Sequence, residues 1–215
     1  TMVNLPSSVE TDFKFTAQQL EEAITPRTRL LLYSSPCNPT GTVFTKEDLE
    51  SYARVLEKYP DIYIVSDEIY EYINYGSGHE SIAQFDFIKD RVVVVNGFSK
   101  GFAMTGWRLG YIAAPLWIAK ACDKLQGQFT SGTCSIAQKA AETAISTDLS
   151  PTYRMRDAFR RRRELIINLL QEVPGFKIND PKGAFYVFPD VSSFFGKTFD
   201  GDLIKDSDDF AMFLL

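Results

Sequence analysis

The stretch Val92-Val-Val-Val-Asn-Gly-Phe-Ser-Lys-Gly101 decides the fold class, because four β-branched residues lead into a turn that holds a lysine between glycines. Such an apolar run is typical of a strand in a parallel sheet that is covered on both faces. Two similar runs precede it, Leu30–Tyr33 and Ile62–Val65, and Thr45 with Asp48 between them resembles a helix cap. A strand, a helix and a strand in this order predict a parallel, right-handed unit.

The rest of the pattern extends this unit into a larger sheet. The run Leu109–Ala114 follows the third strand too closely for a helical crossover, so we expect a fourth strand that is antiparallel. Thr16 with Gln19 predicts an early helix, and three further helices are predicted over 117–128, 135–146 and 151–172. The expected fold class is therefore α/β, a mostly parallel mixed sheet with helices on both faces.

The pattern changes after Val173-Pro-Gly175, where a second, small α+β unit is expected to begin. Ala184–Phe188 predicts a strand, and a last helix is expected to open around 206–209 and to end on apolar residues up to Leu215. An apolar end of this kind is an aggregation liability, so we expect the chain to be cut from a longer protein. The expected organisation is a large domain that is incomplete at its N-terminus (1–150), an interdomain helix (151–175) and a partial small domain (176–215).

Composition narrows the kinds of partner. The 215 residues carry a formal net charge of -5, which gives no general attraction to nucleic acid or to an anionic membrane surface. Cys37, Cys122 and Cys134 are odd in number and widely spaced, as in a protein with reduced thiols, and we expect a cytoplasmic protein without a disulfide or zinc site. The only histidine, His79, excludes a multi-histidine metal site within the chain and is expected on a surface loop.

Polar residues follow the predicted strands at their carboxyl ends. Asn38 follows the first strand, Asp67 and Tyr70 follow the second, and Ser99 and Lys100 follow the third. Ligands of open α/β sheets bind beyond the carboxyl ends of the strands, so we expect these residues to share one site. A lysine there is suited to Schiff-base formation, because an apolar surrounding favours its neutral amine. The alternative is an ordinary surface lysine, which is the commoner case for this residue type.

Taken together, these residue types match the needs of pyridoxal 5'-phosphate. Lys100 supplies an amine, and Asp67 supplies a carboxylate that would keep the pyridine nitrogen protonated, although Asp67 could instead cap the turn after its strand. Asn38 and Tyr70 could hold the ring oxygen. The phosphate would be held by a hydroxyl and a fixed cationic fork, which Ser99 and Arg108 offer.

Three segments then carry a resemblance to a known family. They are Ser34-Ser-Pro-Cys-Asn-Pro-Thr-Gly41, Val65-Ser-Asp-Glu-Ile-Tyr70 and Asn96-Gly-Phe-Ser-Lys-Gly-Phe-Ala-Met-Thr-Gly-Trp-Arg-Leu-Gly-Tyr111. In order and spacing they resemble the signature segments of class I/II pyridoxal phosphate aminotransferases of fold type I. The third segment is most similar to the bacterial aspartate aminotransferases, a branch that also includes enzymes for aromatic substrates. Three ordered motifs are a far more specific signal than a single glycine loop.

The resemblance implies roles for single residues. Lys100 would be the Schiff-base lysine and the base that moves a proton between the substrate's alpha carbon and the cofactor, with Asp67 at the ring nitrogen. Asn38 and Tyr70 would contact the ring hydroxyl, Ser99 and Arg108 would contact the phosphate, and the Asn38–Pro39 bond would be cis. Gly183-Ala-Phe-Tyr-Val-Phe188 resembles the strand that approaches the substrate, although aromatic packing in a half-buried strand explains it equally well.

The resemblance also implies a homodimer and groups that this sequence does not contain. A phosphate loop, a ring-stacking aromatic residue and a substrate-binding arginine would lie outside the chain, so we expect the isolated chain to be inactive. The expected function of the whole protein is amino-group transfer between an amino acid, aspartate-like or aromatic, and a 2-oxo acid. The alternatives are a beta-lyase or another amino-acid aminotransferase of the same fold, and a non-catalytic binding or dimerisation module for the isolated chain.

Overall fold

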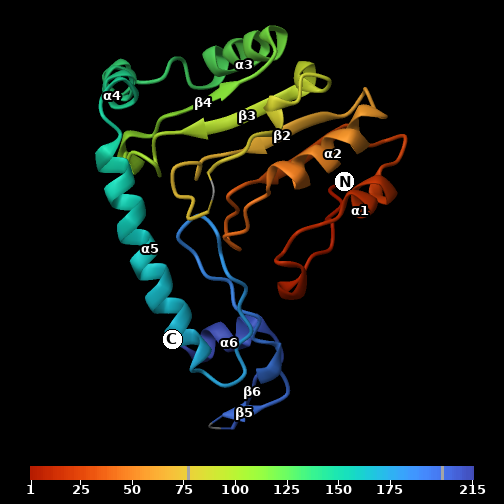
Figure 1. Cartoon of the computed structure of the whole chain (residues 1–215), viewed down its shortest axis with the longest axis vertical. Coiled ribbons are helices and arrows are strands. Elements are labelled where there is room, and N and C mark those ends of the chain that lie inside the picture. The colour runs from red at the N-terminus through yellow and green to blue at the C-terminus, as the bar shows by residue number, and fades with distance from the viewer. Residues whose placement is uncertain (77, 200) are drawn as a thin grey trace.

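The computed structural model describes residues 1–76, 78–199 and 201–215, and its centre is a four-stranded sheet (Figure 1). The strands are β1 (Leu30–Ser34), β2 (Tyr63–Asp67), β3 (Val92–Gly97) and β4 (Gly110–Ala113), and they neighbour one another in that order. β1, β2 and β3 are parallel and β4 is antiparallel to β3, which confirms the predicted mixed sheet and its antiparallel fourth strand.

Side-chain alternation divides the sheet into two faces. Leu31, Tyr33, Ile64 and Ser66 point to one face, and neighbouring residues such as Leu32 point to the other. We call the first, which contains the more deeply buried residues, the covered face, and the second, which is covered only in part, the open face. Because the side-chain period of a strand is two residues, the register alone fixes which residues share a face.

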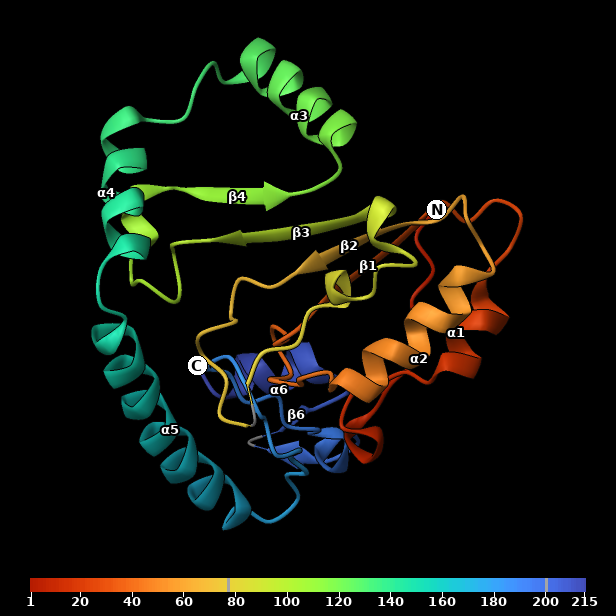
Figure 2. The ribbon, with the colours of Figure 1, turned by 45° about the horizontal axis from the view of Figure 1, so that its top comes forward.

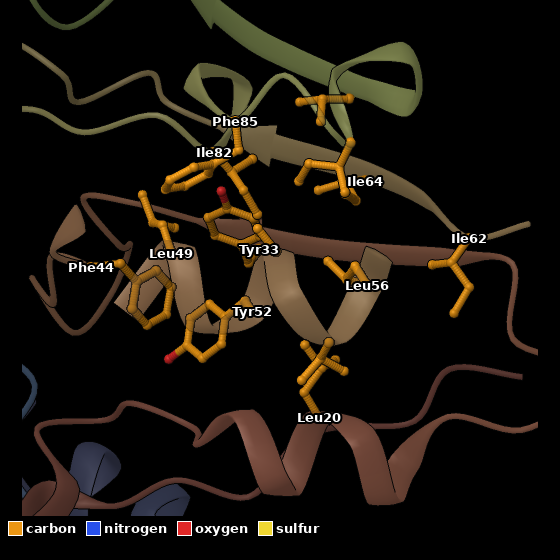
Figure 3. Packing of buried hydrophobic residues seen from close by; sticks show 14 residues of the cluster. Leu20, Tyr33, Phe44, Leu49, Tyr52, Leu56, Ile62, Ile64, Ile82 and Phe85 are labelled. Carbon is orange, nitrogen blue, oxygen red and sulfur yellow. The ribbon is translucent and has the colours of Figure 1, made fainter. Parts of the chain in front are cut away.

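The covered face packs on α1 (Ala17–Ala23) and α2 (Lys46–Glu57). Both helices begin at the predicted caps, because the side chains of Thr16 and Thr45 accept hydrogen bonds from the backbone N–H groups of Gln19 and Asp48. The apolar residues of α2 then meet those of β1 and β2 in a core that is closed to solvent (Figure 3). The members of this core include Leu20, Tyr33, Phe44, Leu49, Tyr52, Leu56, Ile64, Ile82 and Ile88.

Two further helices lie on the other side of the sheet. α3 (Leu116–Phe129) lies beyond β4, away from α1 and α2, in both views (Figures 1 and 2). The ring of Trp117 contacts that of Tyr63, whose side chain is on the open face, at 5.6 Å between centroids. α4 (Ser135–Ser146) packs through Ala141 on the turn after β3. The predicted helices on both faces are therefore present.

The long helix α5 (Ser150–Gln171) leads from the sheet to a second group of elements (Figure 1). This group contains β5 (Thr198–Phe199), β6 (Asp202–Leu203) and α6 (Ser207–Phe213), whose N-terminal cap is Asp206. The rings of Phe176, Phe194 and Phe210 form its apolar centre. The short 3₁₀ helices are η1 (Val9–Thr11), η2 (Ile82–Gln84), η3 (Lys89–Arg91), η4 (Thr105–Trp107) and η5 (Ser192–Phe194).

The predicted strand Ala184–Phe188 is wrong. Ala184 has a φ of 55°, which interrupts an extended backbone, and only isolated bridges at Gly183 and Asp190 flank the segment. Its aromatic side chains pack on residues after β2 instead of alternating across a sheet. In the part of the chain that the structure describes, no helix is long and apolar enough to span a bilayer.

Candidate active site

The carboxyl ends of β1, β2 and β3 meet at one edge of the sheet. Ser34 lies opposite Asp67, and Asp67 lies opposite Val95 in the neighbouring strand. The pairing continues past β2, because the backbone N–H of Glu68 donates to the carbonyl of Val95 at 2.8 Å. The three segments that follow these strand ends carry the candidate residues, so the topology brings them to the same edge, as expected.

The loop after β1 holds Asn38 in an exposed position at this edge. The Asn38–Pro39 peptide bond is cis, which confirms the prediction, and so is the Ser35–Pro36 bond. The carbonyl of Gly41 accepts hydrogen bonds from the backbone N–H groups of Lys182 and Gly183, both at 2.9 Å. Gly41 has a φ of 68°, and a side chain there would collide with Pro181. The Asn38 loop is therefore fastened to the segment that follows α5.

Asp67 ends β2 with its side chain on the open face, half-buried. One carboxylate oxygen, Oδ1, accepts a hydrogen bond from the backbone N–H of Ile69 at 3.2 Å. Within the described ranges, none of the salt bridges involves Asp67. The hydrogen bond from Ile69 corresponds to the alternative role for Asp67, that of capping the turn after its strand. The second carboxylate oxygen remains available to a cationic ligand.

Tyr70 is the most deeply buried of the candidate residues, with 2% of its surface exposed. Its hydroxyl lies 2.7 Å from the hydroxyl of Tyr186, which also accepts a hydrogen bond from the Asn38 side-chain amide at 3.5 Å. Burial, and then the bond to Tyr186, raises the pKa of Tyr70 well above its usual value. The phenol is therefore neutral at physiological pH and keeps a proton that it can donate.

Lys100 lies beside two aromatic rings. Its Nζ is 5.7 Å from the centre of the Tyr70 ring and 5.6 Å from the centre of the Phe185 ring. Both distances are within the range of cation–π attraction. The neighbouring Gly101 backbone approaches Tyr72 so closely that a Cβ would meet the Tyr72 ring at 2.6 Å. The side chain of Lys100 thus lies against the rings of Tyr70 and Phe185. Lys100 forms no salt bridge with the residues that the structure describes.

Ser99 and Arg108 are joined through Thr105. The Thr105 hydroxyl donates to the carbonyl of Ser99 at 2.8 Å, and Nη1 of Arg108 donates to the carbonyl of Thr105 at 3.0 Å. Arg108 ends η4 in a left-handed conformation with a φ of 53° and is exposed. The turn therefore places a guanidinium group and the Ser99 hydroxyl on one short segment next to Lys100.

The structure also contributes two residues to this site that the sequence did not identify as site residues. Tyr186 links Asn38 to Tyr70 through hydroxyl contacts, and Phe185 contacts both Tyr70 and Lys100. Both belong to the Gly183–Phe188 segment, whose resemblance was the only available signal. Their positions depend on contacts across more than a hundred residues of sequence, which no local pattern reveals.

The residues present fit a pyridoxal phosphate. A half-buried carboxylate without a basic partner in the described residues suits a protonated ring nitrogen, and a neutral buried phenol suits a ring oxygen. A lysine amine lies beside the phenol, and Arg108 offers a fork for phosphate oxygens. The donor set therefore has the right chemistry at the ring end and at the phosphate end.

The mixed sheet and the polar groups at its carboxyl edge define the chain as an α/β domain with a candidate ligand site at that edge. A model of the family described as "Aminotransferase class I and II" matches residues 1–206. The chain belongs to this family.

Curated relatives include proteins from plants and bacteria. The chain is 45% identical to the bifunctional aspartate aminotransferase and glutamate/aspartate-prephenate aminotransferase of Petunia hybrida, covering all of the chain and 46% of the relative. It is 41% identical to the aspartate/prephenate aminotransferase of Cereibacter sphaeroides, again over all of the chain and over 54% of the relative. The chain thus spans about half the length of these curated relatives.

Solved structures agree with the fold. The aspartate aminotransferase of Rhizobium meliloti matches with a TM-score of 0.92 at 37% identity, over 96% of this chain and 52% of that one. The aromatic aminotransferase of Pyrococcus horikoshii matches with a TM-score of 0.83 at 42% identity, over 87% and 50% of the two chains. The predicted family and fold class are confirmed.

Proposed function

We propose that the full-length protein transfers amino groups between an amino acid, aspartate-like or aromatic, and a 2-oxo acid, with pyridoxal 5'-phosphate as cofactor. The observation that carries the proposal is the position of the Lys100 amine against Tyr70 at the edge where Asp67 ends β2. The substrate range is supported by the relatives, whose names include aspartate, prephenate and aromatic aminotransferases.

Lys100 and Asp67 have the two roles that the chemistry requires. When bound, the cofactor supplies an electron-withdrawing ring that stabilises negative charge at the substrate's alpha carbon. Lys100 would bind the cofactor through its side-chain amine and would move the proton at that alpha carbon. Asp67 holds the proton on the ring nitrogen through a charge-assisted hydrogen bond. Its position on the open face puts the carboxylate on the side where the helix-covered core does not block a ligand.

The other four candidate residues bind the cofactor and orient it. Tyr70 donates its phenolic proton to the ring oxygen, because its pKa is raised and its hydroxyl stays neutral. Asn38 lies near Tyr70, because its side-chain amide donates a hydrogen bond to Tyr186, which also contacts Tyr70. Ser99 and Arg108 contact the phosphate from the turn that Thr105 braces.

We propose the same division of the chain that its sequence indicated, with a large domain over 1–150, a linking helix over 151–175 and part of a small domain over 176–215. A homodimer in the cytoplasm is the proposed state of the full-length protein. The three free cysteines support a reducing compartment. Light scattering of the full-length protein tests the dimer, and a mass of one subunit at micromolar concentration would reject it.

The test of the function is covalent trapping in the full-length protein. Pyridoxal phosphate is added, borohydride reduces the lysine–cofactor bond, and peptide mapping identifies the labelled residue. We expect the label on Lys100, no labelled peptide around position 100 in a Lys100→Ala variant, and loss of amino-group transfer from aspartate in that variant. Label on other lysines, or unchanged transfer after Lys100→Ala, would overturn the proposal.

The amino-group transfer assay, repeated on the 215-residue chain, tests whether this part is competent alone. The chain is expected to show no transfer activity above the Lys100→Ala control, because its relatives are about twice as long. Measurable transfer well above that control would contradict this expectation.

A further inference from the structure

A buried carboxylate lies directly behind the candidate site, on the covered face of the sheet. Glu68 is 3% exposed and accepts three side-chain hydrogen bonds. Ser66 and Ser81 donate their hydroxyls to Oε1 at 2.8 and 2.6 Å, and Nε2 of His79 lies 2.7 Å from Oε2. We call Ser66, Glu68, His79 and Ser81 the Glu68 cluster. The function proposed above does not use any of these four residues.

His79 lies on a loop, as expected, but its side chain is mostly buried. Its side chain is 15% exposed, and its Nδ1 is buried without a hydrogen-bond partner in the part of the chain that the structure describes. Burial of a charge is costly unless the charge is paired and hydrogen-bonded. Glu68 meets that condition only because the loop before η2 brings His79 and Ser81 back to the end of β2. Three polar side chains therefore contact the carboxylate of Glu68, the residue next to Asp67.

The alternation of the strand connects this cluster to Asp67. Ser66 and Glu68 point to the covered face, and Asp67 between them points to the open face. The backbone is held on both sides, because the N–H of Ser35 donates to the carbonyl of Asp67 at 3.0 Å and the N–H of Glu68 donates to Val95. With residues 66 and 68 fixed from one face, the direction of the Asp67 Cα–Cβ bond on the other face is fixed as well.

We propose that Glu68 is a positioning residue, which through the Glu68 cluster holds Asp67 in the orientation that binds the cofactor's ring nitrogen. The proposal rests on the function proposed above. Among the described residues, the Asp67 carboxylate accepts one hydrogen bond, from the backbone N–H of Ile69, so its orientation depends on the backbone. A charged contact loses strength with small errors of position, and a supporting group that fixes the backbone preserves it.

The first arm of the test needs no cofactor and uses the 215-residue chain. Hydrogen exchange is measured at the Ile69 amide, which reports the Asp67 turn, and at the Ile64 amide inside β2. Glu68→Gln places an amide donor against His79, and Ser81→Ala removes one donor without adding a group. Either variant should speed exchange at Ile69 by about tenfold, with Ile64 unchanged, because only the local opening becomes easier. Glu80→Gln, which changes a carboxylate next to His79 that accepts a hydrogen bond from Gln84 instead of contacting Glu68, is the matched control and should change neither amide.

The second arm compares two ligands on the full-length protein, pyridoxal phosphate and its 1-deaza analogue, which lacks the ring nitrogen. Glu68→Gln and Ser81→Ala should raise the Kd for pyridoxal phosphate by about tenfold, which is the effect of one lost hydrogen bond to a charged group. The Kd for the analogue should not change. Asp67→Asn should show the same selectivity.

The outcomes separate the two proposals. Equal weakening of both ligands by the Glu68 cluster variants would reduce the cluster to a general structural role and overturn the inference. Selectivity in Asp67→Asn without any in Glu68→Gln and Ser81→Ala would also overturn it, while leaving the proposed function intact. If Asp67→Asn does not weaken the binding of pyridoxal phosphate more than that of the analogue, the role of Asp67 is rejected and with it the proposed function. Unchanged exchange at Ile69 in both cluster variants would overturn the inference whatever the ligands do.

Discussion

The two faces of the sheet differ sharply within single strands. In β1, Tyr33 on the covered face is 9% exposed, whereas Leu32, its neighbour on the open face, is 63% exposed. In β2, Ile64 is fully buried under α2, and Asp67 ends the same strand on the open face. One face therefore has a closed apolar core, and the other combines buried residues such as Val93 with exposed Leu32 and the candidate ligand group Asp67.

This difference separates stability from function along one strand. Burial of apolar area is the main favourable term in folding, and it is concentrated on the covered face. The open face contributes less burial in the described residues and carries Asp67 at its edge. Substitutions on the covered face should therefore change the free energy of unfolding, and substitutions at the edge of the open face should change ligand binding.

The largest expected effect is on cofactor affinity in Asp67→Ala. Removing one partner of a buried charge pair costs about 3 to 5 kcal/mol, so the Kd of the full-length protein for pyridoxal phosphate should rise by more than about 100-fold. The melting temperature without cofactor should change little, since in the described part of the chain the Asp67 side chain accepts one hydrogen bond, from the Ile69 backbone. Fluorescence titration and thermal unfolding measure the two quantities. An unchanged Kd would remove the assignment of Asp67, and a collapse of the melting temperature would remove the separation between the faces.

The next effect is on the free energy of unfolding, in a matched pair of leucines. Leu56 of α2 is fully buried against the covered face, and Leu32 is mostly exposed on the open face. Leu56→Ala should lower the free energy of unfolding by about 2 to 5 kcal/mol through lost burial and a residual cavity. Leu32→Ala should lower it by less than about 1 kcal/mol. Urea unfolding of both variants of the 215-residue chain gives the comparison, and equal losses would show that the open face is as well packed as the covered one.

The contrast between the faces also explains what the sequence could predict. Strand runs, the caps at Thr16 and Thr45 and the antiparallel β4 follow from signals within a few residues, and the structure contains all of them. The cis bond before Pro39 was available only through the family resemblance. The six candidate site residues were found by motif, and the structure brings their segments to one edge, although their roles stay proposals.

The failures arose where distant segments decide the outcome. The apolar segment Ala184–Phe188 predicted a strand, but Phe185 and Tyr186 pack on Tyr70 and the backbone turns at Ala184. A polar, glycine-containing sequence predicted a surface loop for His79, but its side chain turns inward, where the buried carboxylate of Glu68 binds it. In both cases the partner is a residue just after β2, whose side chains become accessible only once the sheet has formed.

The smallest expected effect concerns Tyr186, which belongs to neither face and contacts the edge from the segment after α5. Its hydroxyl accepts from Asn38, so its own proton is free to be donated to Tyr70, and the Tyr70 proton is then directed to a ligand oxygen. Tyr186→Phe keeps the ring packing against Tyr70 and removes only this relay. Loss of one such hydrogen bond costs about 1 kcal/mol, so the Kd for pyridoxal phosphate should rise about fivefold.

The matched control is Tyr75→Phe, which removes a hydroxyl that donates to the carbonyl of Ala184. This variant should leave the Kd unchanged. An analogue without the 3-hydroxyl should bind Tyr186→Phe and the unaltered protein equally. If the analogue weakens as well, Tyr186 acts by holding the segment in place, and the relay to Tyr70 is rejected.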